Sequence, residues 1–391
     1  MTDALHARDG CRRVEYRFDI LRDGIPAGTL DAESASLACN KDDAINRSMQ
    51  IVVRSTEGLD LLSDRIRPIM RMLAGRTYRA ATWREINAAV RSWRQIHTAR
   101  MSWRQISEAI QAESWDEYPM GVFIPTTPTY TRGGGARQAK IECYDVTVVL
   151  REDCITERLF FAVGTEYLDA VTQILLSAGI GRTQIVPSAK TLLSDREFEI
   201  GTSKLDICNT LLSEINYNPV RSDANGAIVL TPYVRPTMAQ VMHEYRADEL
   251  SIIAPEITEE TDLYNVPNVF IAVVSNPDLD EDLVSTYVND DPASPLSTVR
   301  RGRRIVSNIY QPDAIASQED LDNYIGRIAF EASQIYQTAE ISTAVMPDHG
   351  TGDTLLIDHP ELSGVFEEIG WSAELKQGGK MTHNIRRLVT A

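Results

Sequence analysis

The sequence predicts an α+β fold that is mainly β, in which strand-rich first and last thirds flank a small α/β module. Three observations support this prediction. Apolar and polar residues alternate in short runs near both ends of the chain, as they do in half-buried strands. Two segments between these runs carry apolar residues at helical spacing. The length of 391 residues exceeds one ordinary core and favours two or three domains.

The first third of the chain contains strand-like runs separated by long stretches of sequence. The pair Asp23-Gly24 provides a turn between the first two runs. Because the other runs must pair across intervening chain, they predict a small antiparallel barrel or a sandwich. We assign residues 1–160 to this first domain. Its predicted strands cover residues 14–21, 28–31, 49–54, 66–72, 120–125 and 139–150.

The middle segment, residues 161–248, predicts a compact α/β module. Thr165 is the candidate N-cap of a first helix, and Gly179 is its candidate end. A second helix is expected from Ser203 onwards, and the pair Asn225-Gly226 predicts a hairpin. The module therefore separates two strand-rich regions.

The last third, residues 249–391, predicts a second strand-rich domain with one long helix. Ser317 and Asp320 form a capping pattern at the start of that helix, which we place at residues 318–337. The predicted strands cover residues 268–275, 340–346, 354–358, 366–375 and 381–389.

A short tryptophan-centred repeat distinguishes residues 80–118 from the rest of the chain. Each copy begins with Ser or Thr, continues with Trp, and has Glu or Gln three residues after its start, which is a capping-box pattern. A step of about ten residues does not return to the same face of a helix. We therefore expect a string of short capped helices, and we place them in an insertion at residues 76–118 of the first domain.

Two interpretations of this short-helix, Trp-rich insertion remain open. The tryptophans can form the small core of the insertion itself, which is the interpretation we favour. Alternatively they form a docking surface for a partner, because Trp and Arg are frequent interface anchors. The candidate docking residues are Trp83, Trp93, Trp103, Trp115, Arg84, Arg94 and Arg104.

The net charge of −17 and the pI near 4.9 oppose general binding to nucleic acid or to an anionic membrane. The N-terminal residues 1–13 are polar and charged and contain no secretory signal, so we expect folding in a cytoplasm. Apolar runs such as 269–274 are far shorter than the roughly 20 residues that span a bilayer, so no membrane insertion is expected.

Charge is unevenly distributed in the last third. Residues 256–291 carry ten acidic side chains and no Lys or Arg. Four arginines follow soon afterwards: Arg300, Arg301, Arg303 and Arg304. A solvated acidic loop beside a basic turn is the simplest interpretation. The alternative is that the opposite charges pair between subunits and fix their register.

No residue pattern predicts a catalytic, cofactor-binding or metal site, so we do not expect an enzyme. His349, Asp353, Asp358 and His359 are close in sequence but lack the spacing of a helical zinc motif, and we interpret them as surface residues in turns. The chain contains no G-x-S-x-G elbow and no phosphate-binding G-x-x-x-x-G-K-[ST] loop. The five cysteines have no C-x-x-C spacing, and Cys143 and Cys208 are interpreted as buried thiols.

The order of several segments carries a family resemblance. The segments are VEYRFDILRDGIPAGTL at 14–30, DLLSDRIRP at 60–68, MGVF at 120–123, YD at 144–145, GT at 164–165, NVPN at 265–268, SPLST at 294–298, and the closing hairpin at 371–388. No single segment is specific, but the ordered set spans the chain apart from the Trp-rich insertion. In this order they resemble the baseplate hub and tail-associated hub proteins of tailed phages.

This resemblance implies two tube-type antiparallel β-barrel domains flanking the α/β module. It also implies a homotrimer that forms a pseudo-sixfold ring in the virion tail tip, assembled in the host cytoplasm. The expected partners are the distal tail protein ring, the end of the tape measure protein, and tip or fibre proteins. Acidic side chains around the ejection channel would let DNA pass without specific binding.

Three alternatives to a hub of a long, non-contractile tail remain. The first is the equivalent hub of a contractile tail or injection machine. Some relatives carry a wall-degrading domain after the hub, so a tail-associated peptidoglycan hydrolase is a further possibility. We expect that activity to be absent, because the sequence ends soon after the last predicted hairpin. The third alternative, a carbohydrate- or receptor-binding protein, is supported by the Trp repeat alone.

Overall fold

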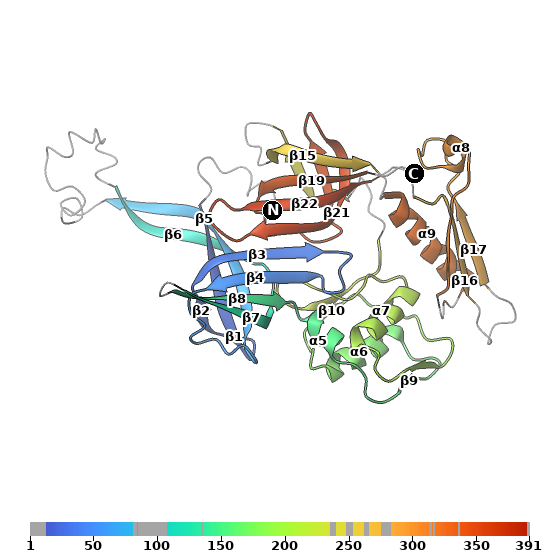
Figure 1. Cartoon of the computed structure of the whole chain (residues 1–391), viewed down its shortest axis with the longest axis horizontal. Coiled ribbons are helices and arrows are strands. Elements are labelled where there is room, and N and C mark those ends of the chain that lie inside the picture. Colours follow the sequence, from blue (N-terminus) through green and yellow to red (C-terminus); the bar gives the residue numbers. More distant parts are fainter. Residues whose placement is uncertain are drawn as a thin grey trace.

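A computed structural model of the protein describes most of the chain. The described residues are 13–80, 84, 108–133, 136–234, 240–247, 253–261, 266–274, 283–312, 315, 317–334 and 337–388. Strands dominate and form two large antiparallel sheets and three small ones, so the prediction of an α+β, mainly β fold is confirmed (Figure 1).

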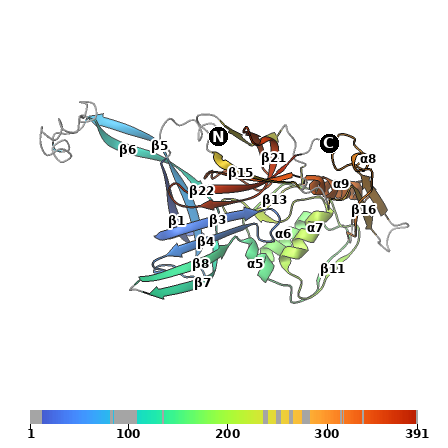
Figure 2. The same ribbon diagram turned by 45° about the horizontal axis from the view of Figure 1, so that its top comes forward.

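The first large sheet comes entirely from the first third of the chain. Its order is β2-β1-β5-β6, built from β1 (Val14–Arg22), β2 (Ile25–Leu30), β5 (Arg65–Ala80) and β6 (Glu108–Pro119). Asp23 and Gly24 both have positive φ, 52° and 79°, and form the predicted turn between β1 and β2. The hairpin of β5 and β6 continues beyond the sheet as a projecting arm (Figures 1 and 2).

The second large sheet joins the two ends of the sequence. Its main path is β15-β19-β22-β21-β3-β4-β8-β7. The first third supplies β3 (Ala32–Asn40), β4 (Arg47–Val53), β7 (Ile124–Gly133) and β8 (Ala136–Tyr144). The last third supplies β15 (Ile253–Thr261), β19 (Gln337–Ala344), β21 (Ser363–Glu374) and β22 (Lys380–Arg387). Two more strands, β14 (His243–Arg246) and β20 (Thr354–Asp358), branch from β21.

The seam between the two halves of this sheet is the pairing of β21 with β3. Five residues pair in antiparallel register, from Gly370 with Asn40 to Glu374 with Ser36. Gly370 is required here by close approach, because a Cβ on it would lie 2.8 Å from the carbonyl oxygen of Cys39. Strands more than 300 residues apart in sequence thereby form one continuous sheet.

The main core lies between the two large sheets and follows the alternation seen in the sequence. On β4, Met49, Ile51 and Val53 are buried while the residues between them are half-buried. Their neighbours on the same face include Leu37 of β3, Ile141 of β8 and Met381 of β22. The core therefore takes side chains from both ends of the chain.

The α/β module packs its own core around two helices, α6 (Tyr167–Ser177) and α7 (Lys204–Glu214). The second helix begins next to Ser203 as predicted, and Ser203 caps it by accepting from the backbone N–H of Asp206. Gly179 has a φ of 76° at the end of α6. The N-cap of α6 is Glu166, one residue after the predicted Thr165. The other elements are α5 (Thr147–Glu152), β9 (Leu159–Phe161), β10 (Thr183–Ile185), β11 (Arg196–Phe198), β12 (Arg221–Ser222) and β13 (Ile228–Leu230).

The last third also contains a small three-stranded sheet covered by one long helix. Its order is β17-β16-β18, and the helix α9 lies on one face of it. The bounds are β16 (Val269–Val274), β17 (Leu283–Val288), α8 (Thr298–Arg301), β18 (Val306–Tyr310) and α9 (Gln318–Gln334). The predicted helix at 318–337 is too long, since Gln337 already begins β19. No helix in the described part is both long and apolar enough to cross a membrane.

Two further predictions are wrong in detail. Residues 147–150 belong to α5 rather than to the end of a strand, because Asp145 accepts from the backbone N–H of Thr147 and starts a helical turn. Both ends of the expected helical insertion are strand, since residues 76–80 belong to β5 and 108–118 to β6. Cys143 and Cys208 are buried free thiols as predicted. The domain bounds and the closure of barrels stay predictions.

Candidate functional site

One face of the main sheet path is lined by small polar side chains, and we call it the polar face. Pairing in register places Ser342, Thr382, Ser372, Ala38 and Ser48 in one row across β19, β22, β21, β3 and β4. A parallel row contains Glu374, Ser36, Gln50 and Glu142. All of these side chains are half-buried or exposed, whereas their neighbours along each strand face the core.

Charges on the polar face are few and of both signs. Glu142, Glu340 and Glu374 are exposed, and so are Lys140 and Lys380. The remaining positions are mainly hydroxyl and amide side chains that span both halves of the sheet. The described part of this face is therefore a mainly polar surface without a basic patch of the kind that attracts phosphate.

The main path ends in two sheet edges. Among the described residues, β7 pairs along its length only with β8, and β15 pairs only with β19. Edge strands present unpaired backbone N–H and C=O groups that can add a strand from another chain. Glu256, Glu259 and Glu260 are exposed on β15, so this edge is acidic.

The projecting arm contains the only candidate docking tryptophan in the described part of the chain. Trp115 lies half-buried on β6, so the fourth repeat copy is strand and not a capped helix. The guanidinium groups of Arg13 and Arg71 lie 5.3 and 5.0 Å from its ring centroid. Trp115 thus stacks with cations of its own chain, and Arg84 is helical and exposed. The positions outside the described residues are Trp83, Trp93, Trp103, Arg94 and Arg104.

Replacing Trp115 by Ala is expected to lower the free energy of unfolding by about 1–2 kcal/mol, because two cation–π contacts and their buried area are lost. The measurement is urea unfolding of the whole chain. The matched control is Trp115→Phe, which keeps an aromatic face and should recover most of the loss. Equal losses in the two variants would contradict the stacking interpretation.

The arginine cluster lies at the turn between α8 and β18. Ser297 caps α8 by accepting from the backbone N–H of Arg300, while Arg300, Arg303 and Arg304 are exposed. Arg301 is half-buried and donates to the carbonyl oxygen of Val266 at 2.8 Å. Arg301 therefore holds the turn against the segment that contains Val266 in the same chain. Charge contacts of the cluster with another subunit stay a prediction.

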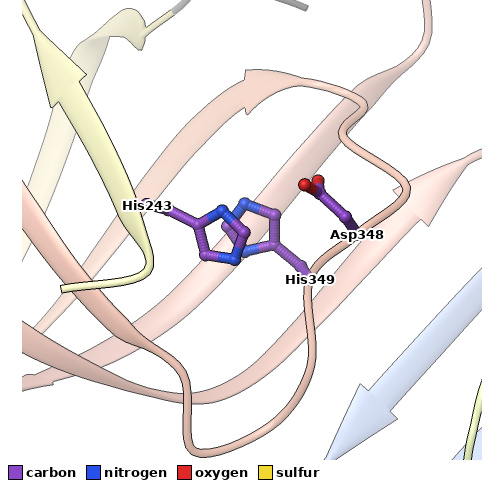
Figure 3. A group of neighbouring side chains, drawn as sticks. All are labelled: His243, Asp348 and His349. Carbon is purple, nitrogen blue, oxygen red and sulfur yellow. The ribbon is translucent and has the colours of Figure 1, made fainter. Parts of the chain in front are cut away.

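Three histidines that are scattered in the sequence meet in the core of the last third. His243 comes from β14, His349 from the loop between β19 and β20, and His383 from β22. All three are buried, with exposures of 5%, 2% and 0%. Figure 3 shows the rings of His243 and His349 face to face, with Asp348 beside them; their centroids are 3.8 Å apart. The interpretation of His349 as a surface residue in a turn is therefore wrong.

A single buried carboxylate joins two of these histidines. The Nδ1 atoms of His349 and His383 each lie 2.5 Å from a different oxygen of Glu368, which is fully buried on β21. On their far sides, Nε2 of His349 lies 2.6 Å from the hydroxyl of Tyr245, and Nε2 of His383 lies 2.8 Å from that of Thr343. We call His349, Glu368 and His383 the histidine–glutamate network.

Burial and charge act in opposite directions on the network. Burial favours the neutral form of Glu368, but the neighbouring imidazoles, His349 above all, outweigh it and hold the pKa of Glu368 at about 2. Burial also disfavours the charged form of His349, yet Glu368 outweighs it and raises the pKa of that imidazole. For His383 burial prevails, and its pKa is lowered. One carboxylate thus faces one readily protonated histidine and one that resists protonation.

Histidines and carboxylates at this spacing are common metal ligands, but the geometry does not fit a shared ion. The rings of His243 and His349 are within 14° of parallel, so the in-plane lone pairs of one ring cannot converge with those of the other on one ion. The contacts of 2.5 Å in the network are direct hydrogen bonds. Nitrogen and oxygen ligands each about 2 Å from a tetrahedral zinc ion lie farther apart than that. The arrangement is suited to holding protons.

Sequence reasoning missed this network because its members are far apart along the chain. His349 and Glu368 are separated by 19 residues, and Tyr245 and His349 by 104. The one available signal was that His383 and Glu368 lie on strands predicted to be neighbours in a terminal hairpin. The pairing of β21 with β22 brings them together.

Comparison with known proteins supports the assignment of the fold. No family model and no curated protein matches the chain. A tail protein from Neisseria meningitidis is 13% identical with a TM-score of 0.62, covering 95% of this chain and 97% of that one. A 43 kDa prophage tail protein from Shewanella oneidensis is 8% identical with a TM-score of 0.59, covering 95% and 98%. A prophage tail protein from Listeria monocytogenes is 11% identical with a TM-score of 0.52, covering 94% of each chain.

These similarities extend over nearly the whole of both chains in each pair, so they concern the complete arrangement of sheets and module rather than one shared motif. The identities are low, and the likeness is therefore one of architecture. The protein has the fold of phage tail proteins.

Proposed function

We propose that this chain is a structural hub of a phage tail tip, in which three copies form a pseudo-sixfold ring around the channel for DNA. The observation that carries the proposal is the fold, which this chain shares over about its whole length with tail proteins from three bacteria. The ring would join the tail tube and the distal tail ring to tip or fibre proteins, and would contact the end of the tape measure protein.

The main sheet path supports the pseudo-sixfold arrangement. It consists of two four-stranded units, one from each end of the sequence, joined at the seam of β3 with β21. Three copies of the chain supply six such units. If β7 of one copy pairs with β15 of the next, the sheet closes on itself and no edge remains exposed. Closure would explain why, among the described residues, each end strand of the path pairs along one side only.

The polar face supports the assignment of the channel wall. The core lies on the opposite face of the sheet, so in a closed ring the polar face is the surface available to line the opening. Hydroxyl groups and glutamates make few of the counterion-releasing contacts that hold DNA. DNA would then pass along this wall without binding to it.

A lysine on the acidic edge strand tests the ring directly. Thr258 is exposed on β15, and Thr258→Lys places a charge on the edge in the way that natural proteins block strand addition. We expect trimers to be replaced by monomers in native mass spectrometry, with a melting temperature within about 2 °C of the original, since exposed substitutions change stability little.

The matched control is Thr286→Lys, which adds the same charge to an exposed position on β17 in the separate three-stranded sheet. This variant should assemble normally. Equal assembly of both variants would contradict edge pairing through β15. Clearing of a peptidoglycan zymogram by the purified chain would argue instead for the tail-associated hydrolase.

A further inference from the structure

The strand β14 is the link between the α/β module and the last third of the chain. Among the described residues it pairs with β20, through four residues in parallel register. Its two buried side chains, His243 and Tyr245, point away from solvent toward the histidine–glutamate network, while Glu244 and Arg246 are exposed. Besides the backbone pairing with β20, the contacts of these two side chains therefore help to hold β14 in place.

Both buried side chains of β14 have polar partners in or beside the network. Tyr245 meets Nε2 of His349 at 2.6 Å, and Nε2 of His243 lies 3.1 Å from a carboxylate oxygen of Asp353. His243 also stacks on His349, and its Nδ1 has no hydrogen-bond partner among the described residues. A change in the charge of His349 or His383 therefore alters the electrostatic surroundings of both His243 and Tyr245.

The charge balance of the network favours one imidazolium beside the ionised Glu368 at neutral pH. Glu368 is an ionised carboxylate that accepts from two imidazoles, so one imidazolium cancels its charge. A second imidazolium would leave a positive charge in a core where His349 and His383 have ring centroids 4.8 Å apart. Loss of the first imidazolium would leave Glu368 as an unpaired buried anion.

We propose that the histidine–glutamate network is a proton-controlled latch, which fixes β14 while it holds one proton and releases it when it holds two or none. The device is independent of the ring proposal, because all its parts lie within one chain. It would make the junction between the α/β module and the last third sensitive to pH.

Several charged groups of the described residues surround the latch. Glu367, next to Glu368, pairs with Lys41 and Arg386 and so compensates its own charge. Asp353 also accepts from the backbone N–H of Gly350 at 2.7 Å. Other titratable or charged groups of the described residues near the network include Asp348 of the same loop, Cys39 of β3, Arg47 of β4, Asp145 and Arg221 of β12.

A cavity lies close to the latch. A pocket of about 370 Å³ lies between the α/β module and the last third, and Asp353 and Met242 are part of its lining. Asp353 contacts His243, which stacks on His349. The cavity therefore reaches Asp353, the partner of His243, while the network itself is buried.

The direction in which each pKa moves determines how the stability of the latch depends on pH. The lowered pKa of His383 stabilises the fold above the ordinary value near 6.5, and this contribution is lost as the pH falls through the lowered value. The raised pKa of His349 stabilises the fold below about 6.5, and this contribution is lost as the pH rises through the raised value. Together they predict that β14 is held best in a window near neutral pH.

The test is hydrogen exchange of the backbone amides of β14 in the whole chain between pH 5 and pH 9, corrected for the intrinsic exchange rate. We expect protection to be greatest near neutral pH and to fall by about tenfold toward each limit, because uptake or loss of one proton changes the opening equilibrium by about tenfold per pH unit. Imidazole ¹⁵N spectra of the same protein should show one network histidine charged and the other neutral at pH 7. Flat protection, or two histidines titrating together near pH 6.5, would overturn the latch.

The variant Glu368→Gln removes the charge and keeps the shape of the carboxylate. Both network histidines should then be neutral at pH 7, and the loss of protection at alkaline pH should disappear while the loss at acid pH remains. The matched control is His359→Gln, a half-buried histidine outside the network, which should leave the profile unchanged. Retention of the alkaline loss in Glu368→Gln would contradict the proposal.

The ¹⁵N spectra of the original protein do not depend on whether the variant folds, so they test the proton assignment by themselves. Addition of equimolar Zn²⁺ distinguishes proton storage from metal binding. The histidine signals should not move. A stoichiometric displacement of the His349 and His383 signals, with a rise in melting temperature, would assign the network to a metal and overturn the latch.

Discussion

Substitution of Gly370 by Val is expected to lower the free energy of unfolding by about 2–3 kcal/mol, the upper part of the range for overpacked positions. Gly370 lies at the seam where β21 pairs with β3, and a Cβ there would meet the carbonyl oxygen of Cys39 at 2.8 Å and Cα of Asn40 at 3.2 Å. Both are backbone atoms, so the strands must separate. The seam joins the two halves of the main sheet.

The control for this variant is Gly326→Ala on the helix α9. A Cβ at Gly326 meets nothing within 4 Å, so this change should stabilise the chain by about 0.5–1 kcal/mol through helix propensity. Urea unfolding of both variants measures the difference. A Gly370→Val variant as stable as the original would mean that β21 and β3 are not in contact as described.

Substitution of Asp145 by Ala is expected to cost about 3 kcal/mol. The carboxylate is fully buried between β8 and the α/β module, where it accepts from the backbone N–H of Thr147 at 2.9 Å and from the hydroxyl of Ser222 at 2.7 Å. It also accepts from the hydroxyl of Thr147. Alanine leaves all three donors buried without a partner, and each unsatisfied group costs about 1–3 kcal/mol, with partial relaxation expected.

The control for Asp145→Ala is Ser222→Ala, which removes only one of the three hydrogen bonds. It should lower the free energy of unfolding by about 1 kcal/mol. Thermal unfolding of the two variants at one pH gives both values. If the two losses are equal, Asp145 does not join β8 to the module in the way that its contacts indicate.

The fold class was predictable because its signals are local. Alternation on β4 and β22, the positive φ of Gly24, and the cap of α7 by Ser203 all depend on residues within a few positions of one another. Local hydrogen bonding and strand periodicity determine these features, and the structure reproduces them with displacements of a few residues.

The seam and the histidine–glutamate network were not predictable because they depend on partners far apart in sequence. Nothing in the run around Cys39 indicates that it pairs with Trp371. The prediction of a capped helix around Trp115 was wrong for a different reason. The capping pattern there competes with the pairing of Trp115 to Leu73 on β5. There the long hairpin ladder outweighs one short helix.

Electron microscopy of the purified whole chain tests the ring directly, through the symmetry of the class averages. We expect threefold rings of pseudo-sixfold appearance with a central opening, because three copies supply six four-stranded units whose edges can pair. Closed dimers without a channel would contradict it, since pairing of two copies would use the β7 and β15 edges without forming a ring.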